Sequence, residues 1–236
     1  MHRSPAVIAR ADVPTVADDA WDEAFDAAVR SGTLHPLEAS FARSLPLPRR
    51  ATFMAGRQAL RAALAELPAD AVREVPILRT PRGAPALPPA VTGSITHKRT
   101  LAMAAVAPRV DRLQHLGLDL ERRPTADDLR RPSIGRKILT AGEYAFVQQW
   151  GEDTLEGREQ VLVHFALKEA VYKAIDPFVE RYVRFTEVEL DLADAADVRV
   201  TLHLPEASVA DVHVEAHWHT DGEWIVAAAY SHARGD

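Results

Sequence analysis

The chain of 236 residues contains no cysteine. Disulfides and thiolate metal sites are therefore excluded, and a bound metal ion would have to take oxygen or nitrogen ligands. Hydrophobic residues make up 47% of the chain and charged residues 26%, which indicates a folded globular protein rather than a disordered one. A chain of this length buries a full core as one large domain or as two small ones.

Long apolar runs are also absent from the sequence. The longest, such as LAMAAVA at residues 101–107, is far too short to span a membrane. The N-terminal stretch MHRSPAVIARADVP has no apolar segment as long as that of a signal peptide. We therefore expect a cytoplasmic protein without a membrane partner, and the formal net charge of −6 argues against nucleic acid as the main partner.

The apolar periodicity and the positions of Pro and Gly predict the order of helices and strands. In the first half we expect helices over 18–29, 36–44 and 49–67, a strand over 72–79, a Pro-rich loop over 80–93 and a strand pair formed by SITHK and LAMAAVA. In the second half we expect a strand over 115–121, a helix opened by a Thr140–Glu143 capping box, a helix over 157–176 that stops at Pro177, and three or four final strands with a hairpin at Asp221-Gly222.

This pattern predicts the α+β class. We expect two pseudo-symmetric α/β subdomains, residues 1–111 and 112–236, each with a small, mainly antiparallel sheet packed on a long helix.

The strand GLDLE at residues 117–121 carries two acidic side chains. Residues two apart on a strand point to the same face, so Asp119 and Glu121 lie side by side, whereas Leu118 and Leu120 point the other way. Adjacent like charges repel one another, and partial burial removes their hydration. A divalent cation would offset both costs.

The helical segment FALKEAVYKAI, residues 165–175, is apolar nearly all round, which predicts packing on several sides. Glu169 continues the apolar stripe at an inward position, and Lys173 lies one turn beyond it. Alone, this pair also fits an ordinary solvent-exposed i,i+4 contact. Together with the two strand acids, Glu169 would complete a three-carboxylate Mg²⁺ site.

Other polar groups are weaker signals by themselves. Arg57 and Arg61 share a helix face, which fits either a ligand site or a solvated basic surface. His97 in GSITHK fits a hydrogen-bonded strand end. The segment VHVEAHWH alternates cleanly, so His213, His217 and their neighbours are better explained as a solvated strand face than as a metal site.

The five motifs in this order resemble the 4′-phosphopantetheinyl transferase superfamily, in its surfactin-type, enterobactin-synthetase-component-D-like branch. They are a GR-containing basic helix, RGxPxxP, GSITHK, GLDLE and FALKEAVYKA, and they cover about residues 49–185. The resemblance implies a Mg²⁺-dependent enzyme that moves phosphopantetheine from coenzyme A to a serine of an apo acyl or peptidyl carrier protein, releasing 3′,5′-ADP. Mn²⁺ is the alternative ion, and we expect a monomer.

The resemblance also implies the site residues. The metal ligands would be Asp119, Glu121 and Glu169, with Glu169 and Lys173 as the catalytic pair. The coenzyme-binding positions would be Arg49, Arg57, Arg82, Gly83, Ala84, Pro85, Thr96, His97, Lys168 and Lys173. The fatty-acid, polyketide and nonribosomal peptide pathways all remain open for the carrier.

The sequence departs from the family pattern at Leu87, where the proline loop commonly has an aromatic residue. Two other functions remain as alternatives. A Mg²⁺-dependent nuclease or phosphohydrolase would usually place Lys two residues after the second acid, where Arg123 stands here. A catalytically silent relative that only binds carrier proteins would have lost part of the acid–lysine set, which consists of Asp119, Glu121, Glu169 and Lys173. This chain keeps all four residues.

Overall fold

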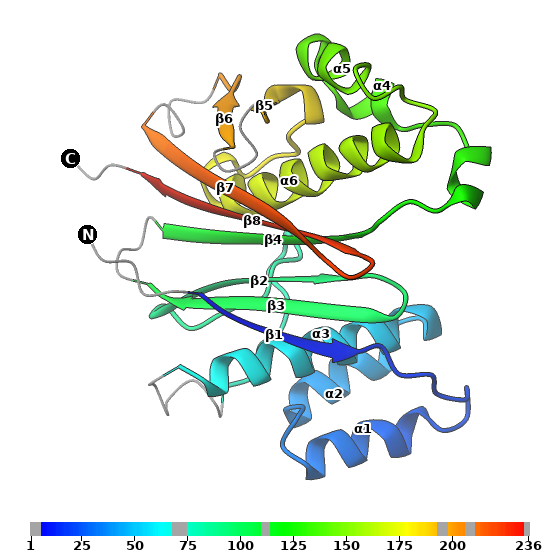
Figure 1. The fold of residues 1–236 in the computed structure, drawn as a ribbon. Helices are drawn as coiled ribbons and strands as arrows, with labels where there is room; N and C mark the ends of the chain where they lie inside the picture. Colours follow the sequence, from blue (N-terminus) through cyan, green and yellow to red (C-terminus); the bar gives the residue numbers. More distant parts are fainter. Residues whose placement is uncertain (1–5, 68–74, 110–113, 193–197, 206–210, 234–236) are drawn as a thin grey trace. The chain divides into compact units, whose positions relative to one another are not determined.

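The computed structural model describes residues 6–67, 75–109, 114–192, 198–205 and 211–233 (Figure 1). The chain divides into two compact units, Met1–Arg112 and Leu113–Asp236. The boundary that we expected, between residues 111 and 112, lies outside the described residues. Within the described part of the chain, no helix is both long and apolar enough to cross a membrane.

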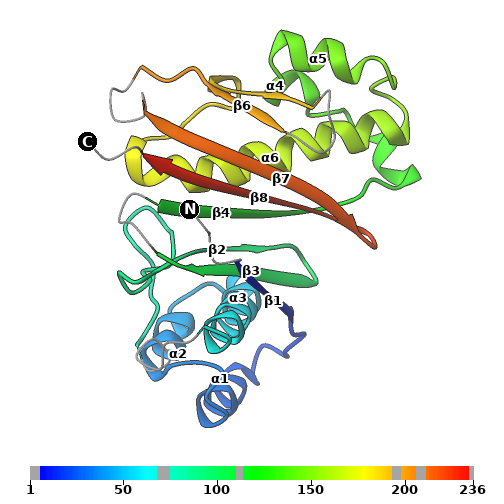
Figure 2. The same cartoon turned by 60° about the vertical axis from the view of Figure 1, so that its left-hand side comes forward.

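The N-terminal unit is a three-stranded antiparallel sheet packed on one long helix. Its elements are β1 (Val7–Asp12), α1 (Trp21–Arg30), α2 (Pro36–Arg43), α3 (Leu47–Ala65), β2 (Val91–His97) and β3 (Leu101–Pro108). The strand order is β1-β3-β2. Helix α3 packs against the sheet, and α1 and α2 lie beyond α3 (Figures 1 and 2). The core between α3 and the sheet includes Leu60, Leu64 and Val106.

The C-terminal unit has the same kind of core. Its elements are β4 (Gln114–Arg122), η2 (Ala126–Arg130), α4 (Gly135–Ile138), α5 (Ala141–Val147), α6 (Leu155–Val179), η3 (Phe185–Glu187), β5 (Val188–Asp191), β6 (Arg199–Leu202), β7 (Val212–Asp221) and β8 (Trp224–Ala233). The antiparallel sheet has the order β4-β8-β7, and β5 and β6 form a separate two-stranded sheet. Helix α6 packs along β4 and β8. The predicted α+β class, with a small sheet packed on a long helix, is confirmed.

Helix α6 approaches β4 very closely. A Cβ atom on Gly117 would collide with the backbone carbonyl of Ala170, so a residue with a side chain does not fit between strand and helix. The buried side chains of Leu167, Val171 and Ala174 belong to the core of this unit, together with Ala227 and Ala229 of β8. The face of β4 that carries Gly117 is therefore packed directly on α6.

Two local predictions are wrong. Residues 75–78 form no strand, and Arg79 makes only an isolated bridge with Pro85, because side chains take several of the backbone groups of this segment. Residues 72–74 lie outside the described part. Helix α6 does not stop at Pro177 but runs to Val179, since a proline in the last turn removes only one backbone bond. Glu180 then ends the helix in the left-handed conformation, and its N–H donates to the Asp176 carbonyl.

Other predictions are confirmed. Strands β2 and β3 form the expected antiparallel pair. Thr140 and Glu143 form the capping box of α5. The turn between Asp221 and Trp224 joins β7 to β8, with Gly222 at a φ of 59°. Such a positive φ is what a tight hairpin turn requires, and glycine adopts it without strain.

Candidate functional site

The two acids of β4 lie on the face that is packed on α6. Asp119 and Glu121 follow Gly117 by two and four residues, and residues at this spacing on a strand share a face. Asp119 is 6% exposed and Glu121 is 8% exposed. The shared face is therefore as predicted, and both carboxylates are buried.

Lys173 of α6 binds the first of these acids. Its Nζ donates to Oδ1 of Asp119 at 2.6 Å and to the carbonyl oxygen of Leu118 at 2.8 Å. The charge of Asp119 is thus compensated by a lysine from the facing helix. The other oxygen of this carboxylate, Oδ2, is buried and accepts no hydrogen bond from the described residues.

Glu169 lies one helical turn before Lys173 and is half-buried. Among the described residues, no three His, Asp or Glu side chains are gathered closely enough to hold a metal ion. The structure thus brings Lys173 to Asp119 but does not bring the three predicted acids to one point. The residue types nonetheless fit Mg²⁺, because carboxylate oxygens are the ligands that this hard cation prefers.

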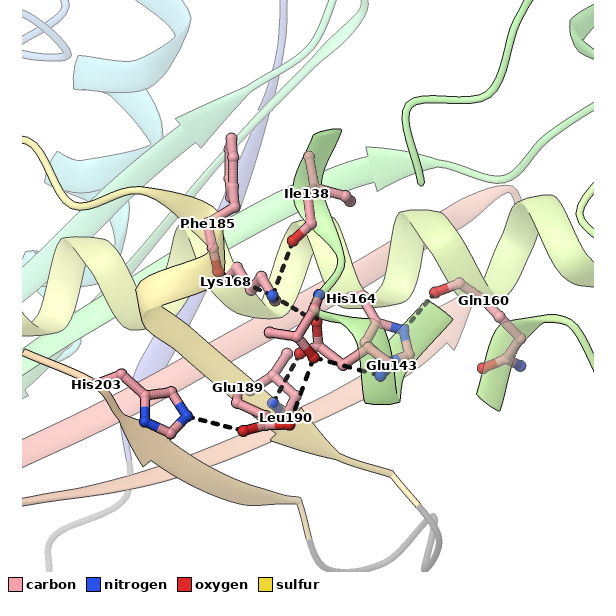
Figure 3. A network of polar contacts seen from close by, with 10 residues as sticks. Ile138, Glu143, Gln160, His164, Lys168, Phe185, Glu189, Leu190 and His203 are labelled. Carbon is pink, nitrogen blue, oxygen red and sulfur yellow. Dashed lines mark hydrogen bonds and ion pairs between the residues drawn. The ribbon is translucent and has the colours of Figure 1, made fainter. Parts of the chain in front are cut away.

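Lys168 does not have the environment that the resemblance implied. Its side chain is fully buried, and Nζ donates to the carbonyl oxygens of Ile138 and Phe185, each at 2.9 Å, and to Oε2 of Glu143 at 2.7 Å (Figure 3). An ammonium group has three hydrogens to donate, and protein atoms accept all three. Burial lowers the pKa of Lys168, and Glu143 opposes that shift. We therefore assign Lys168 a structural role instead of a contact with the diphosphate.

Glu143 connects this lysine of α6 to two other elements, α5 and β5. Its Oε2 also accepts from the Thr140 N–H at 2.6 Å, which caps α5, and its Oε1 accepts from the Leu190 N–H of β5 at 2.8 Å. The Glu143–Lys168 pair therefore ties α5 and β5 to α6. Sequence reasoning identified Glu143 only as a capping residue.

His164 lies one turn before Lys168 and was not singled out from the sequence (Figure 3). Its Nδ1 is 2.8 Å from the carbonyl oxygen of Gln160, so this nitrogen carries the proton and donates it. Its Nε2 is buried and has no hydrogen-bond partner in the part of the chain that the structure describes. Burial lowers the pKa of the imidazole below 6.5.

In the N-terminal unit, Arg57 is buried and binds backbone oxygens. Its Nε donates to the Ile77 carbonyl at 2.6 Å and its Nη2 to the Leu78 carbonyl at 3.1 Å. The guanidinium lies over the Phe53 ring, 4.6 Å from the centroid. Burial lowers the pKa of Arg57 to about 10. The structure thus gives Arg57 protein partners where we expected a coenzyme phosphate.

The RGAP segment forms the tip of a tight turn. The Gly83 N–H donates to the Thr80 carbonyl at 2.9 Å, and the Thr80 N–H donates to the Ala84 carbonyl at 2.8 Å. Gly83 has a φ of 93°, a conformation that residues with a side chain rarely adopt, so this position favours glycine. Arg82 and Ala84 are exposed, whereas Gly83 and Pro85 are half-buried.

The other predicted coenzyme-binding residues of this unit occupy two elements. Arg49 is exposed in the first turn of α3. Thr96 is buried near the end of β2, and His97 is exposed at its last position. Leu87, which replaces the aromatic residue of the family pattern, packs against the core of this unit.

The histidines of β7 form an exposed face, as predicted. His213, His217 and His219 are all exposed, whereas Ala216 on the opposite face is buried. The ring of His213 stacks on that of His232, with centroids 5.5 Å apart.

Two family models match the chain. One is described as the 4′-phosphopantetheinyl transferase N-terminal domain and matches residues 37–107, and the other is described as the 4′-phosphopantetheinyl transferase superfamily and matches residues 115–229. The 4′-phosphopantetheinyl transferase Npt of Nocardia iowensis is 31% identical over 156 residues, which are 66% of this chain and 65% of that protein. The match thus spans slightly less than two thirds of this relative.

Solved structures give a weaker similarity. A Chronobacterium ammoniagenes ACPS–CoA complex is 23% identical with a TM-score of 0.40, and the match covers 52% of this chain and 98% of that chain. The acyl carrier protein synthase of Mycobacterium tuberculosis is 23% identical with a TM-score of 0.38, and the match covers 50% of this chain and 96% of that chain. At these TM-scores, the structural similarity carries no weight for the site.

Proposed function

The chain belongs to the 4′-phosphopantetheinyl transferase superfamily, and from this premise we propose that it transfers phosphopantetheine from coenzyme A to a serine of an apo carrier protein. In this reaction the serine oxygen forms a bond to the β-phosphorus of the coenzyme, and 3′,5′-ADP leaves.

The observation that carries this proposal is the group of charged residues on the facing surfaces of β4 and α6. The strand supplies two buried acids, Asp119 and Glu121. The helix supplies Glu169 and Lys173, of which Lys173 already contacts Asp119. Burying several ionisable groups together lowers the stability of a fold. Clusters of buried ionisable groups are therefore common at reactive sites, where they serve the chemistry.

A divalent cation fits this donor set. Asp119, Glu121 and Glu169 would hold Mg²⁺, with Mn²⁺ as the alternative, because all three offer carboxylate oxygens. The bound ion would neutralise charge on the diphosphate.

The residues of α6 supply the proton chemistry. We infer that the Glu169 carboxylate accepts the proton of the attacking serine hydroxyl, since it is half-buried on α6 one turn before Lys173, which contacts an acid of β4. The Lys173 ammonium would stabilise negative charge on the leaving phosphate, because it is a point charge on a side chain that is 28% exposed.

The coenzyme would be bound largely by the N-terminal unit. Arg49, Arg82 and His97 are exposed and offer donors for phosphate oxygens, while Gly83 to Pro85 offer backbone at a tight turn. Thr96 is the remaining candidate on β2. Lys168 is not among the proposed direct ligands, because protein oxygens accept all three of its hydrogens. Arg57 is buried and donates to two backbone carbonyl groups, so a phosphate contact would use its remaining N–H groups.

We further propose that the protein is a cytoplasmic monomer of the surfactin-type branch. Its carrier would come from fatty-acid, polyketide or nonribosomal peptide synthesis. The nuclease and silent-relative alternatives are not favoured, since the family models match both units and the acid–lysine set is complete.

The decisive experiment is incubation of the protein with coenzyme A, Mg²⁺ and a panel of apo carriers from the three pathways. Intact-mass spectrometry should show one phosphopantetheine added to at least one carrier, with an equal amount of 3′,5′-ADP released. Chelation of the metal, or a Ser→Ala change in the carrier, should each stop the transfer. An unmodified panel in the presence of all three reactants would refute the proposed function.

A further inference from the structure

Lys168 fixes one side of α6 through bonds to three other elements. Its Nζ donates to the Ile138 carbonyl of α4, to the Phe185 carbonyl of η3 and to Oε2 of Glu143 in α5 (Figure 3). All three hydrogens of the ammonium group are used, so a rotation of the helix about its axis would break at least one of these bonds. Residue 168 is thereby held in one place on this side of the helix.

The carboxylate that binds Lys168 is itself fixed at both of its oxygens. Oε2 of Glu143 also accepts from the Thr140 N–H at 2.6 Å, and Oε1 accepts from the Leu190 N–H at 2.8 Å. Bonds in which one group is charged are about twice as strong as bonds between neutral groups. The ion pair is therefore a rigid connection between α6 and the segments around it.

The opposite side of α6 is fixed two residues further along the chain. A Cβ atom on Gly117 would collide with the Ala170 carbonyl, so β4 meets the backbone of the helix there. Successive residues of a helix point about 100° apart, so Lys168 and Ala170 lie on nearly opposite sides of α6. Glu169 lies between them and points about 100° away from each.

Both chain neighbours of Glu169 are thus held, and they are held from opposite sides of the helix. A helix that is fixed on one side alone can rock about that contact, whereas contacts on both sides prevent this motion. The two contacts together therefore determine the direction in which the half-buried Glu169 side chain leaves α6.

We propose that Lys168 and Glu143 are positioning residues for Glu169. In this proposal the ion pair holds α6 at the rotation that directs the Glu169 carboxylate toward the attacking serine hydroxyl. Both residues act through the helix, since both side chains are buried. The rate of a positioned reaction depends steeply on geometry, and a misplacement of about 1 Å reduces it by about 10²-fold. The inference rests on the proposed function for the role of Glu169 as proton acceptor.

The first test compares rate with stability in the double variant Lys168→Met/Glu143→Gln. Its two new side chains are neutral, so the net charge of the pair is unchanged. The double variant should be more stable in urea than Lys168→Met alone. Its single-turnover rate at saturating coenzyme A and carrier should nonetheless stay at least about tenfold below that of the wild type, with unchanged affinity for coenzyme A.

Two outcomes of this test contradict the proposal. A rate that returns together with stability would show that the pair only stabilises the fold. A loss of coenzyme affinity with an unchanged rate would show that the pair acts on binding. Should the double variant fail to fold, Glu143→Gln alone provides the same comparison, because an amide has one oxygen for the three groups that bind the carboxylate.

Arg158→Met is the matched control. Arg158 is also a buried cation of α6, and it donates to the carbonyl groups of Glu152 and Arg131 at 2.9 and 2.8 Å. It lies about three turns before Lys168, so its loss leaves the contacts on both sides of Glu169 in place. The control should lower stability and keep the wild-type single-turnover rate. An equal loss of rate in Arg158→Met would attribute the effect to lower stability in general and would overturn the proposal.

A further test needs no ligand, because the chain contains no cysteine. A trifluoromethyl thiol label at Glu169→Cys reports the surroundings of residue 169 in the free protein by fluorine NMR. Adding Lys168→Met/Glu143→Gln should shift or split its resonance, whereas adding Arg158→Met should not. An unchanged resonance would refute the positioning role alone. A shifted resonance, in a protein whose wild type modifies no carrier, would refute the proposed function alone.

Discussion

Lys173 and Asp119 form an ion pair between α6 and β4, with Nζ and Oδ1 2.6 Å apart. The two elements are far apart in sequence, and this contact places an ammonium group beside the first of two adjacent acids. The lysine thus compensates a charge that a divalent cation would also compensate.

Replacing Asp119 by Ala should abolish Mg²⁺-dependent transfer. The fold should persist, because the Lys173 side chain is 28% exposed and still donates to the Leu118 carbonyl, so water shares its charge. Turnover and circular dichroism would be measured together. Asp127→Ala is a suitable control, since Asp127 is 83% exposed and should be dispensable. Wild-type turnover in a folded Asp119→Ala protein would contradict the metal assignment.

Replacing Glu169 by Gln should slow the chemical step far more than it weakens coenzyme binding. A general base typically contributes about 10² to 10⁴ in rate, and it acts mainly in the transition state. Single-turnover kinetics and calorimetry separate the two quantities. Glu156→Gln, at an exposed position of the same helix, is the control. Equal losses in rate and affinity would instead indicate a binding role for Glu169.

Replacing Lys168 by Met should lower the free energy of unfolding by about 3–5 kcal/mol, since it leaves the buried Glu143 carboxylate without its cation. Adding Glu143→Gln should recover part of this loss, because a neutral amide needs no cation beside it and its oxygen still accepts from one of the two backbone N–H groups. Urea unfolding of the three proteins measures both effects. Folded Lys168→Met should bind coenzyme A like the wild type, and a large loss of affinity would restore Lys168 as a ligand.

His164 should make the protein less stable in mild acid. Burial lowers its pKa below the 6.5 of an exposed imidazole, so the unfolded chain binds a proton before the folded chain does. Stability contributed by the neutral ring is therefore present above about pH 6.5 and is lost as the pH falls below it, by at most about 1.4 kcal/mol per pH unit.

The difference between wild type and His164→Leu isolates this effect. Glu143 and Lys168 are the charged groups that act on His164, and they oppose one another. Asp128 and Glu187 also have lowered pKa values, but their usual values of 3.8 and 4.5 put their effect at lower pH. Urea unfolding from pH 8 to pH 5 should show a smaller loss in His164→Leu. Parallel curves would refute the assignment.

The sequence predicted the elements that local pattern determines. The alternation of GLDLE placed Asp119 and Glu121 on one strand face, and Thr140 with Glu143 marked the start of α5. Strand β1 was missed. The burial of Lys168 was also missed, because neighbouring residues on a helix point about 100° apart, and pattern alone does not show which of Lys168 and Glu169 meets a distant partner.

Glu38 and Glu143 illustrate the same limit. Each is the N3 residue of a capping box, three positions after the N-cap residue, and sequence can reveal this spacing. Each also uses its other oxygen to accept a backbone N–H far along the chain, from Ile77 and from Leu190 respectively. Each pairs with a basic residue on the long helix of its unit, as in the Glu143–Lys168 pair. These second partners arise only when the segments between them have folded.

Gly117 has a consequence for how the acid–lysine group responds to change. Since backbone meets backbone at Gly117 and Ala170, no flexible side chain lies between strand and helix to absorb a shift. Any added atom there would move the whole helix, and with it Glu169 and Lys173, relative to the acids of β4. Gly117, which has no side chain, thus determines the distance between the charged groups of α6 and those of β4.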